Sequence, residues 1–408
     1  MQYNLLFSRL GEIATLFFKL GVIGFGGPVA HIAMIEDEVV KRRRWLTQDH
    51  FLDLLGATNL IPGPNSTEMA IHVGYIYAGW AGLIVSGVCF ILPAVLITGI
   101  FAWIYVNYGS LPQIAPLLYG IKPAVLAVIV NALWGLAKKA VKNRQLLIIA
   151  IAVGLLILVR QVNEVVALLF GGLLGMIWLH PRNQDKPPGN KPNLLIAVLT
   201  TGATLQTTST ISTVASGSIP LWQLGWFFLK VGSVLFGGGY VLIAFLQGGL
   251  VQEYGWLTQQ QLLDAIAIGQ FTPGPVLSTA TFIGYVLAGV PGAIVATIGI
   301  FLPSFLFVAA LNPIIPRLRS SAWTRSFLDA VNASAVALMV VAALQLGIAT
   351  LKIAKPPYVD ILGIAIALIS IVLITRYRIN AAWLVLGSSL IGYGAMALGY
   401  IKFSFMRI

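Results

Sequence analysis

Long apolar stretches dominate this chain, and short polar connections separate them. Residues 81–104, 117–136, 145–159 and 361–375 are examples of such stretches. A helix needs about 20 apolar residues to cross the ~30 Å hydrocarbon layer of a membrane, and these stretches reach or approach that length. The pattern predicts an all-α integral membrane protein, in which many helices form a polytopic bundle.

Composition narrows the class further. Of the 408 residues, 58% are hydrophobic and 9% are charged, whereas soluble proteins have about 25% charged residues. The single cysteine, Cys89, excludes a disulfide framework and a cysteine metal site. His31 and His72 have no suitably spaced partners either, so we expect no metal and no cofactor.

The chain repeats itself. Phe17-Phe18-Lys19-Leu20-Gly21 returns as Phe228-Leu229-Lys230-Val231-Gly232, a shift of 211 residues from Lys19 to Lys230. The same shift aligns Trp45-Leu46-Thr47 with Trp256-Leu257-Thr258 and Pro62-Gly63-Pro64 with Pro273-Gly274-Pro275. Later matches, such as Pro93 with Pro303, need a shift of 210. Such self-similarity indicates a duplicated gene.

These matches divide the chain into two transporter-like repeats. We expect an N-terminal repeat over 1–180, a polar, proline-rich cytoplasmic linker over 181–192, an extra transmembrane segment over 193–213, and a C-terminal repeat over 214–408.

The net charge of +12 indicates how the chain is oriented in the membrane. The cations gather in short connections, which is the positive-inside bias of membrane proteins and argues against nucleic-acid binding. If Lys41–Arg44 is cytoplasmic, alternating spans place most other cations on that side, including Lys138, Lys142 and Arg378. The repeat partner of Lys41–Arg44, residues 252–255, has no cation. Equivalent loops are therefore expected on opposite faces, so that the repeats are inverted, as in many secondary transporters.

Two kinds of glycine-proline break recur in both halves. The first kind is Gly24-Phe25-Gly26-Gly27-Pro28 with Phe236-Gly237-Gly238-Gly239, and the second is the pair of Pro-Gly-Pro sequences. Proline interrupts a helix, and irregular backbone at membrane depth survives only beside protein or a watery cavity. We expect broken or re-entrant helices at these positions.

The breaks are also predicted helix starts. Pro64, followed by Asn65-Ser66-Thr67-Glu68, has the residues of a first helical turn. Unpaired N–H groups and the helix dipole favour an anion there. The alternative is that the breaks are kinks for close packing. Because both kinds are duplicated, we favour a substrate site, whose candidates are Gly26, Gly27, Pro28, Pro62, Gly63, Pro64, Asn65, Gly237, Gly238, Gly239, Gln270, Thr272, Pro273, Gly274 and Pro275.

Lys19 and Lys230 are further candidates for substrate binding. Each precedes a glycine break within an apolar run, where a cation costs roughly 3 kcal/mol and therefore faces a cavity or a partner. Two ammonium groups suit a dianion. The alternatives are snorkelling to the interface and pairing with a carboxylate such as Glu12 or Asp53.

Three carboxylates are candidates for ion coupling. Asp53 and Asp264 are repeat equivalents that would relay protons or clamp the lysines, although capping of the segments after Thr47 and Thr258 is the simpler interpretation. Glu68 would titrate or only complement a helix dipole.

The whole set of motifs resembles the chromate ion transporter family of the long, two-domain type. The resemblance rests on Phe25-Gly26-Gly27-Pro28 with His31, on the Trp-Leu pairs and both Pro-Gly-Pro sequences, and on Gly269-Gln270-Phe271-Thr272. One departure is Asn59, which stands where the second half has Gln270. The resemblance implies a multi-pass protein of the cell membrane that exports chromate, with sulfate as the chemical look-alike.

The resemblance leads to a mechanistic expectation and to rivals. We expect alternating access driven by the membrane potential or an ion gradient, with the bilayer and the oxyanion as partners and homo-oligomerisation left open. The rivals are an anion channel and a transporter of another anion such as sulfate. An enzyme is not expected, because neither His-Glu-x-x-His nor Gly-x-Ser-x-Gly occurs.

Overall fold

The chain folds as an all-α membrane protein, confirming the expected class. The computed structural model describes residues 2–109, 111, 114–160, 162–179, 219–311, 321–351 and 360–398. The expected linker over 181–192 and the extra segment over 193–213 lie outside these ranges. Within them, four helices are long and apolar enough to cross a membrane, namely 65–108, 116–140, 276–310 and 322–351.

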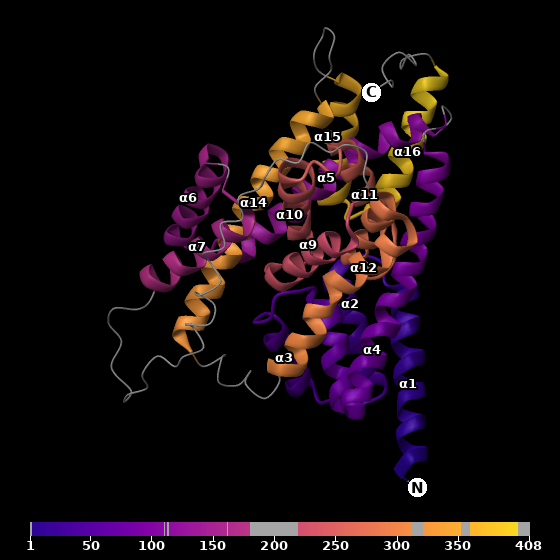
Figure 1. Cartoon of the computed structure of the whole chain (residues 1–408), viewed down its shortest axis with the longest axis vertical. Helices are drawn as coiled ribbons and strands as arrows, with labels where there is room; N and C mark the ends of the chain where they lie inside the picture. Colours follow the sequence, from indigo (N-terminus) through magenta and orange to yellow (C-terminus); the bar gives the residue numbers. More distant parts are fainter. Residues whose placement is uncertain are drawn as a thin grey trace.

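The first half contains seven α-helices and one π-helical turn among its described residues (Figure 1). They are α1 (Gln2–Ile23), α2 (Gly27–Glu36), η1 (Asp37–Arg42), α3 (Gln48–Thr58), α4 (Asn65–Tyr108), α5 (Ala115–Ala140), α6 (Arg144–Arg160) and α7 (Glu164–Trp178).

The second half repeats most of this order. Its elements are α9 (Leu221–Val234), η2 (Gly239–Val241), α10 (Leu242–Phe245), η3 (Leu246–Glu253), α11 (Gln259–Phe271), η4 (Val276–Ser278), α12 (Thr279–Leu311), α14 (Ala322–Leu351), α15 (Ile361–Arg376) and α16 (Ala381–Ala397). A π-helical turn follows the glycine break in both halves, as η1 and as η3.

α4 folds back on itself near its start. Its backbone leaves the helical region at Ala78 and Gly79, and a Cβ built on Gly82 would stand 2.1 Å from the Gly74 carbonyl oxygen. Eight residues of straight helix span about 12 Å, so this contact requires a reversal. α12 turns in the same way at Ala288 and Gly289.

The two halves exchange their last helices. α5 packs on α15 and α16 of the second half, and its counterpart α14 packs on α6 and α7 of the first, as Figure 1 shows for α14 beside α6 and α7. At the end of α5, the Lys142 ammonium lies 2.8 Å from an Asp329 carboxylate oxygen on α14. This contact joins the end of α5 to the start of α14.

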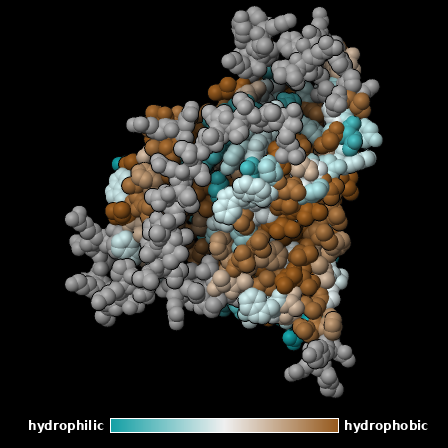
Figure 2. Space-filling model, viewed as in Figure 1, coloured by the Kyte–Doolittle hydropathy of each residue, from teal (hydrophilic) through white to brown (hydrophobic). Residues whose placement is uncertain are grey.

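The outer surface suits a bilayer. Large apolar side chains stay exposed along the long helices, for example Ile100 on α4, Trp134 on α5 and Ile298 on α12. Figure 2 shows hydrophobic residues over most of the described surface on this face, with hydrophilic residues in smaller groups. The extensive exposed apolar area is what lipid contact requires.

Candidate functional site

The glycine breaks adopt backbone conformations that explain their composition. Gly26 and Gly27 have φ of 108° and 77°, and Gly237 and Gly238 have φ of 90° and 96°. Side chains rarely tolerate this left-handed region. α2 then begins at Gly27 with Pro28 in its first turn, so the predicted helix start is confirmed.

The Pro-Gly-Pro breaks follow the same logic. Gly63 and Gly274 have φ of 144° and 95°, and α4 begins at Asn65 directly after Pro64, as predicted. In the second half, Pro273 disfavours helical backbone at the residue before it. Thr272 is accordingly extended, and α11 ends at Phe271.

Each half's Pro-Gly-Pro break bonds the other half's glycine break. The Gly274 N–H donates to the Gly24 carbonyl oxygen at 2.7 Å, and the Gly63 N–H donates to the Leu235 carbonyl oxygen at 2.8 Å. Gly63 and Gly274 are repeat equivalents, as are Gly24 and Leu235. A reciprocal exchange of equivalent contacts is the arrangement that a two-fold relation produces, and it brings all four breaks together in two pairs.

One of these pairs opens into a cavity of about 590 Å³. Its floor includes the first glycine break and the Gln270–Gly274 segment, and its walls come from α5, α15 and the start of α16. The polar and glycine residues that line it are Gly24, Gly26, Gly27, Asn131, Lys138, Tyr240, Gly269, Gln270, Thr272, Gly274, Thr375, Arg378 and Asn380.

The cavity is positively charged. Lys138 and Arg378 line it, and no aspartate or glutamate does among the described residues. The Lys138 ammonium stands 4.8 Å from the centroid of the Trp134 ring, a cation–π distance that orients the amine. Arg378 has φ of 54°, an unusual value for a side chain other than glycine. Arg378 directly follows the C-cap of α15, where a left-handed residue commonly ends a helix, and the next N–H, that of Ile379, donates to the Leu373 carbonyl oxygen at 3.3 Å.

Gln270 provides an unsatisfied donor at this site. Its amide nitrogen is buried and has no hydrogen-bond partner among the described residues, although buried polar groups are nearly always paired. The neighbouring Thr272 hydroxyl is already engaged, because it donates to the Ile268 carbonyl oxygen at 2.7 Å. An anion in the cavity would supply the missing acceptor for Gln270.

The other pair of breaks is closed. Pro62, Gly63 and Pro64 are buried, and a Cβ on Gly63 would stand 2.2 Å from Glu68 Oε1 and 2.5 Å from Ser304 Oγ. The Asn65 amide donates to Asn59 Oδ1 at 2.7 Å. Several predicted candidates therefore do not line the cavity; they are Pro28, Pro62, Gly63, Pro64, Asn65, Gly237, Gly238, Gly239, Pro273 and Pro275.

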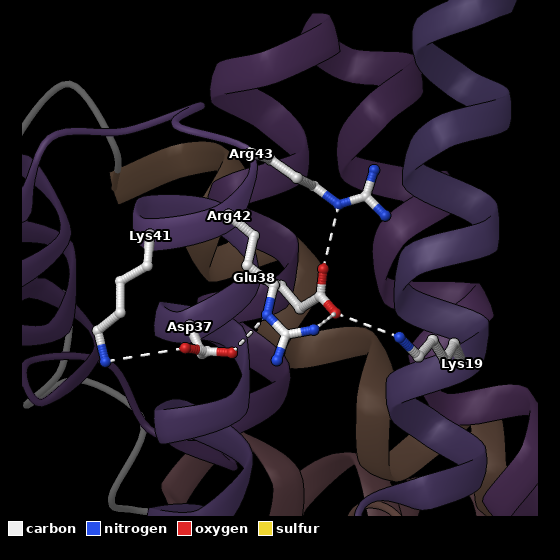
Figure 3. Close-up of polar contacts among 6 residues, drawn as sticks. All are labelled: Lys19, Asp37, Glu38, Lys41, Arg42 and Arg43. Atoms are coloured by element: carbon white, nitrogen blue, oxygen red, sulfur yellow. Dashed lines mark hydrogen bonds and ion pairs between the residues drawn. The ribbon is translucent and has the colours of Figure 1, made fainter.

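Lys19 and Lys230 also lie away from the cavity lining. The Lys19 ammonium is 3.2 Å from Glu38 Oε1, and Figure 3 shows Lys19 and Arg43 pointing at this carboxylate, with Arg42 bridging it to Asp37. Lys19 thus pairs with a carboxylate, as one of the alternatives proposed, and this carboxylate is Glu38. The Lys230 ammonium lies 5.8 Å from the centroid of the Phe227 ring.

The ion cluster around Glu38 connects α1 to η1 across the first glycine break. Burial alone raises the pKa of Glu38, but the hydrogen bonds and charges of Lys19 and Arg43 outweigh it and lower the pKa below its usual value. The pairing of α1 with η1 shows that the chain reverses at Gly24–Gly27, as the re-entrant prediction requires.

The three candidate coupling carboxylates have different surroundings. Asp53 is exposed on α3, whereas Asp264 is buried on α11 and accepts a hydrogen bond from the Tyr105 hydroxyl at 2.9 Å. Neither caps its helix, because the Thr47 and Thr258 side chains do so; the capping interpretation was wrong. Glu68 is fully buried in the first turn of α4.

Sequence reasoning missed Lys138, Arg378, Asn131, Tyr240 and Asn380 at the cavity. Lys138 and Arg378 looked like ordinary cytoplasmic charges. One available signal was the repeat itself, because the positions equivalent to Asn131, Trp134 and Lys138 are the apolar Val341, Leu344 and Ile348.

Comparisons with known proteins point in one direction. A family model described as "Chromate transporter" matches residues 11–176 and 222–393. A chromate transport protein of Cupriavidus metallidurans is 33% identical over 391 residues, covering 95% of this chain and 94% of the relative. A probable chromate transport protein of Synechococcus elongatus is 32% identical over 340 residues, covering 83% and 84%.

A chromate transport protein of Pseudomonas aeruginosa is 28% identical over 395 residues, covering 96% of this chain and 92% of the relative. No solved structure matches the chain.

Proposed function

The chain belongs to the chromate transporter family, and from that premise we propose that it exports chromate across the cell membrane through the cavity at the Gly24–Gly274 break. The observation that carries the proposal is the cavity's chemistry. Two cations and an unpaired amide donor converge where irregular backbone from both halves meets. Charged donors bind oxyanions more strongly than neutral ones do.

Repeat asymmetry supports export over uptake. Lys138 on α5 corresponds to Ile348 on α14, and Trp134 to Leu344. Under the orientation that the cations favour, Lys138 and Arg378 face the cytoplasm. An anion is then attracted from the inside, whereas the equivalent wall on the other side is apolar and does not retain it.

Energetics agree with this direction. The membrane potential acts on each charge with ~2.3 kcal/mol per 100 mV, so a dianion gains about 4.6 kcal/mol on leaving an inside-negative cell. At about 1.4 kcal/mol per tenfold in concentration, this opposes a gradient of roughly three decades. Export therefore runs downhill on the potential alone.

Alternating access is the mechanism that fits the paired breaks. The Gly24–Gly274 pair lines an open cavity, while Glu68 and Ser304 fill the space beside Gly63 in the equivalent pair. If the repeats are inverted, opening one pair while the other closes exposes the site to one side at a time. A channel would need both pairs open together.

Uptake of labelled chromate into everted membrane vesicles tests the function. We expect accumulation that an imposed lumen-positive potential drives and that excess sulfate inhibits. If the vesicles accumulate sulfate and not chromate, the transported anion is sulfate. Absence of accumulation of either anion under any gradient would overturn it.

A further inference from the structure

A second polar cluster lies beside the closed pair of breaks. Glu68 and His72 are both 0% exposed. Within the part of the chain that the structure describes, neither the two carboxylate oxygens nor the two ring nitrogens have a hydrogen-bond partner. The hydroxyls of Thr67 and Ser304 are likewise buried and unpaired. Buried polar atoms without a partner are rare in proteins, and such atoms call for a functional explanation.

Two of these groups, Glu68 and Ser304, lie against the Gly63 break. Glu68 Oε1 and Ser304 Oγ lie 2.2 Å and 2.5 Å from the position of a Cβ on Gly63. His72 follows Glu68 by four residues on α4, and such pairs lie one above the other on a helix face. Gly63 in turn bonds Leu235 of the second half. The cluster therefore sits at a contact between the halves.

The second half has no titratable equivalent. The repeat partner of Glu68 is Thr279, whose hydroxyl donates to the Val276 carbonyl oxygen at 2.8 Å. The partner of Thr67 is Ser278, which accepts a hydrogen bond from Thr98. The partner of Ser304 is Ala94, and apolar residues stand opposite His72. If Glu68 and Thr67 had only a structural role, we would expect them to be hydrogen-bonded as their second-half equivalents are.

We propose that Glu68 and His72 form a proton-binding site, and that proton inflow through this site is exchanged for chromate export. The inference rests on the proposed function. An isolated carboxylate without a partner is too costly to bury ionised, so Glu68 carries a proton in this conformation. His72, one turn away, is the group to which that proton passes.

Other titratable groups near α4 are occupied or exposed. His31 on α2 bonds Gly24 and Ser66. Asp264 on α11 bonds Tyr105. On α1, Arg9 and Glu12 both bind Tyr77, and Lys19 binds Glu38. On α2, Glu36 binds Gln48. The titratable residues of α3, namely Asp49, His50 and Asp53, are exposed. α12 carries no acidic or basic residue.

The proton balance of one cycle is simple. The Glu68 O–H bond forms with a proton from the outer side and breaks when that proton passes to a ring nitrogen of His72. The new N–H bond breaks when the proton leaves on the inner side, and no electron is transferred. When Glu68 loses its proton, its carboxylate carries a negative charge beside Gly63. Water that enters as the break opens would stabilise this charge. Deprotonation therefore favours separation of Gly63 from Leu235, the movement that alternating access needs.

Chromate uptake into liposomes holding the full-length protein in everted orientation tests the proposal. The potential is clamped at zero with potassium and valinomycin, and the lumen is made two pH units more acidic than the medium. We expect at least tenfold faster chromate uptake than without the pH gradient. Glu68→Gln and His72→Gln should each lose this stimulation, and Glu12→Gln should retain it.

The outcomes separate the two proposals. Uptake driven by a potential but not by the pH gradient in wild-type protein overturns the proton site and leaves chromate transport standing. Uptake driven by neither overturns the function itself. Because glutamine mimics the protonated acid, Glu68→Gln should elute as one species with an unchanged Tm. Full pH stimulation in this variant, or Glu68→Asp failing to restore part of it, would contradict the proposal.

Discussion

Single side chains determine how strongly the cavity binds an anion. Lys138 lines it, whereas its neighbour Lys139 does not, and the two carry the same charge on the same helix. This pair separates a local effect on the substrate from the general effect of cytoplasmic charge on insertion and steering.

Replacing Lys138 by glutamine should raise the KM for chromate about tenfold or more, because a hydrogen bond or ion pair to a charged group contributes about 1.5–3 kcal/mol. Lys139→Gln is the matched control and should change KM less than twofold. Initial rates of vesicle uptake over a range of chromate concentrations measure both. Equal effects of the two variants would mean that the cavity cation does not contact the substrate.

At Glu38 the expected effect is on stability. The folded-state pKa of Glu38 is lowered by Lys19 and Arg43, so the pairing stabilises the protein fully above the unfolded pKa of about 4.3 and is lost as the pH falls through the lower folded value. Glu38→Gln should therefore lower the Tm at pH 7, and the difference should shrink below about pH 4. A difference independent of pH would contradict this assignment.

At the scale of elements, the turns inside α4 and α12 place the strictest requirement on residue type. Gly79 and Gly289 have nearly the same backbone, with φ of 63° in both and ψ of −148° and −152°. Glycine alone populates this region, and other residues held there cost about 1–3 kcal/mol.

Gly79→Ala should therefore lower the Tm by a few degrees, although a Cβ at Gly79 would meet no atom within 4 Å. Gly99→Ala is the control, because Gly99 has equally open space and ordinary helical backbone. It should be neutral or stabilising by about 0.5–1 kcal/mol. Thermal unfolding of both variants in detergent micelles provides the comparison, and equal destabilisation would contradict the backbone argument.

Helix starts and breaks could be predicted from sequence because their causes are local. Proline and glycine at Pro28, Pro64 and Gly274 fix the backbone whatever surrounds them. The cavity wall could not be predicted, since Lys138 and Arg378 reach it only after α5 and α15 from different halves pack together. Glu38 was missed for a similar reason, because the reversal at Gly24–Gly27 decides which carboxylate meets Lys19.

For the whole molecule, the exchanged contacts argue for a two-fold relation between the halves. Gly274 bonds Gly24 as Gly63 bonds Leu235, and α5 packs on α15 and α16 as α14 packs on α6 and α7. If the axis lies in the membrane plane, equivalent positions face opposite sides.

Cysteine labelling tests this inversion. With Cys89 replaced by serine, Asp49→Cys and Gln260→Cys place single thiols at equivalent, exposed positions at the starts of α3 and α11. In intact cells, an impermeant maleimide should label the cysteine at position 260 and not the one at 49. Labelling of both from the same side would show that the halves are parallel.

Chromate export through the Gly24–Gly274 cavity is the central claim, and flux through purified protein in liposomes tests it most directly. Labelled chromate would be loaded inside, an inside-negative potential imposed with potassium and valinomycin, and efflux compared between wild-type protein and Gln270→Leu. We predict potential-driven efflux well above that of protein-free liposomes, reduced about tenfold or more in the variant, which lacks the cavity's free amide donor. Efflux equal to that of empty liposomes, or undiminished in Gln270→Leu, would contradict the account.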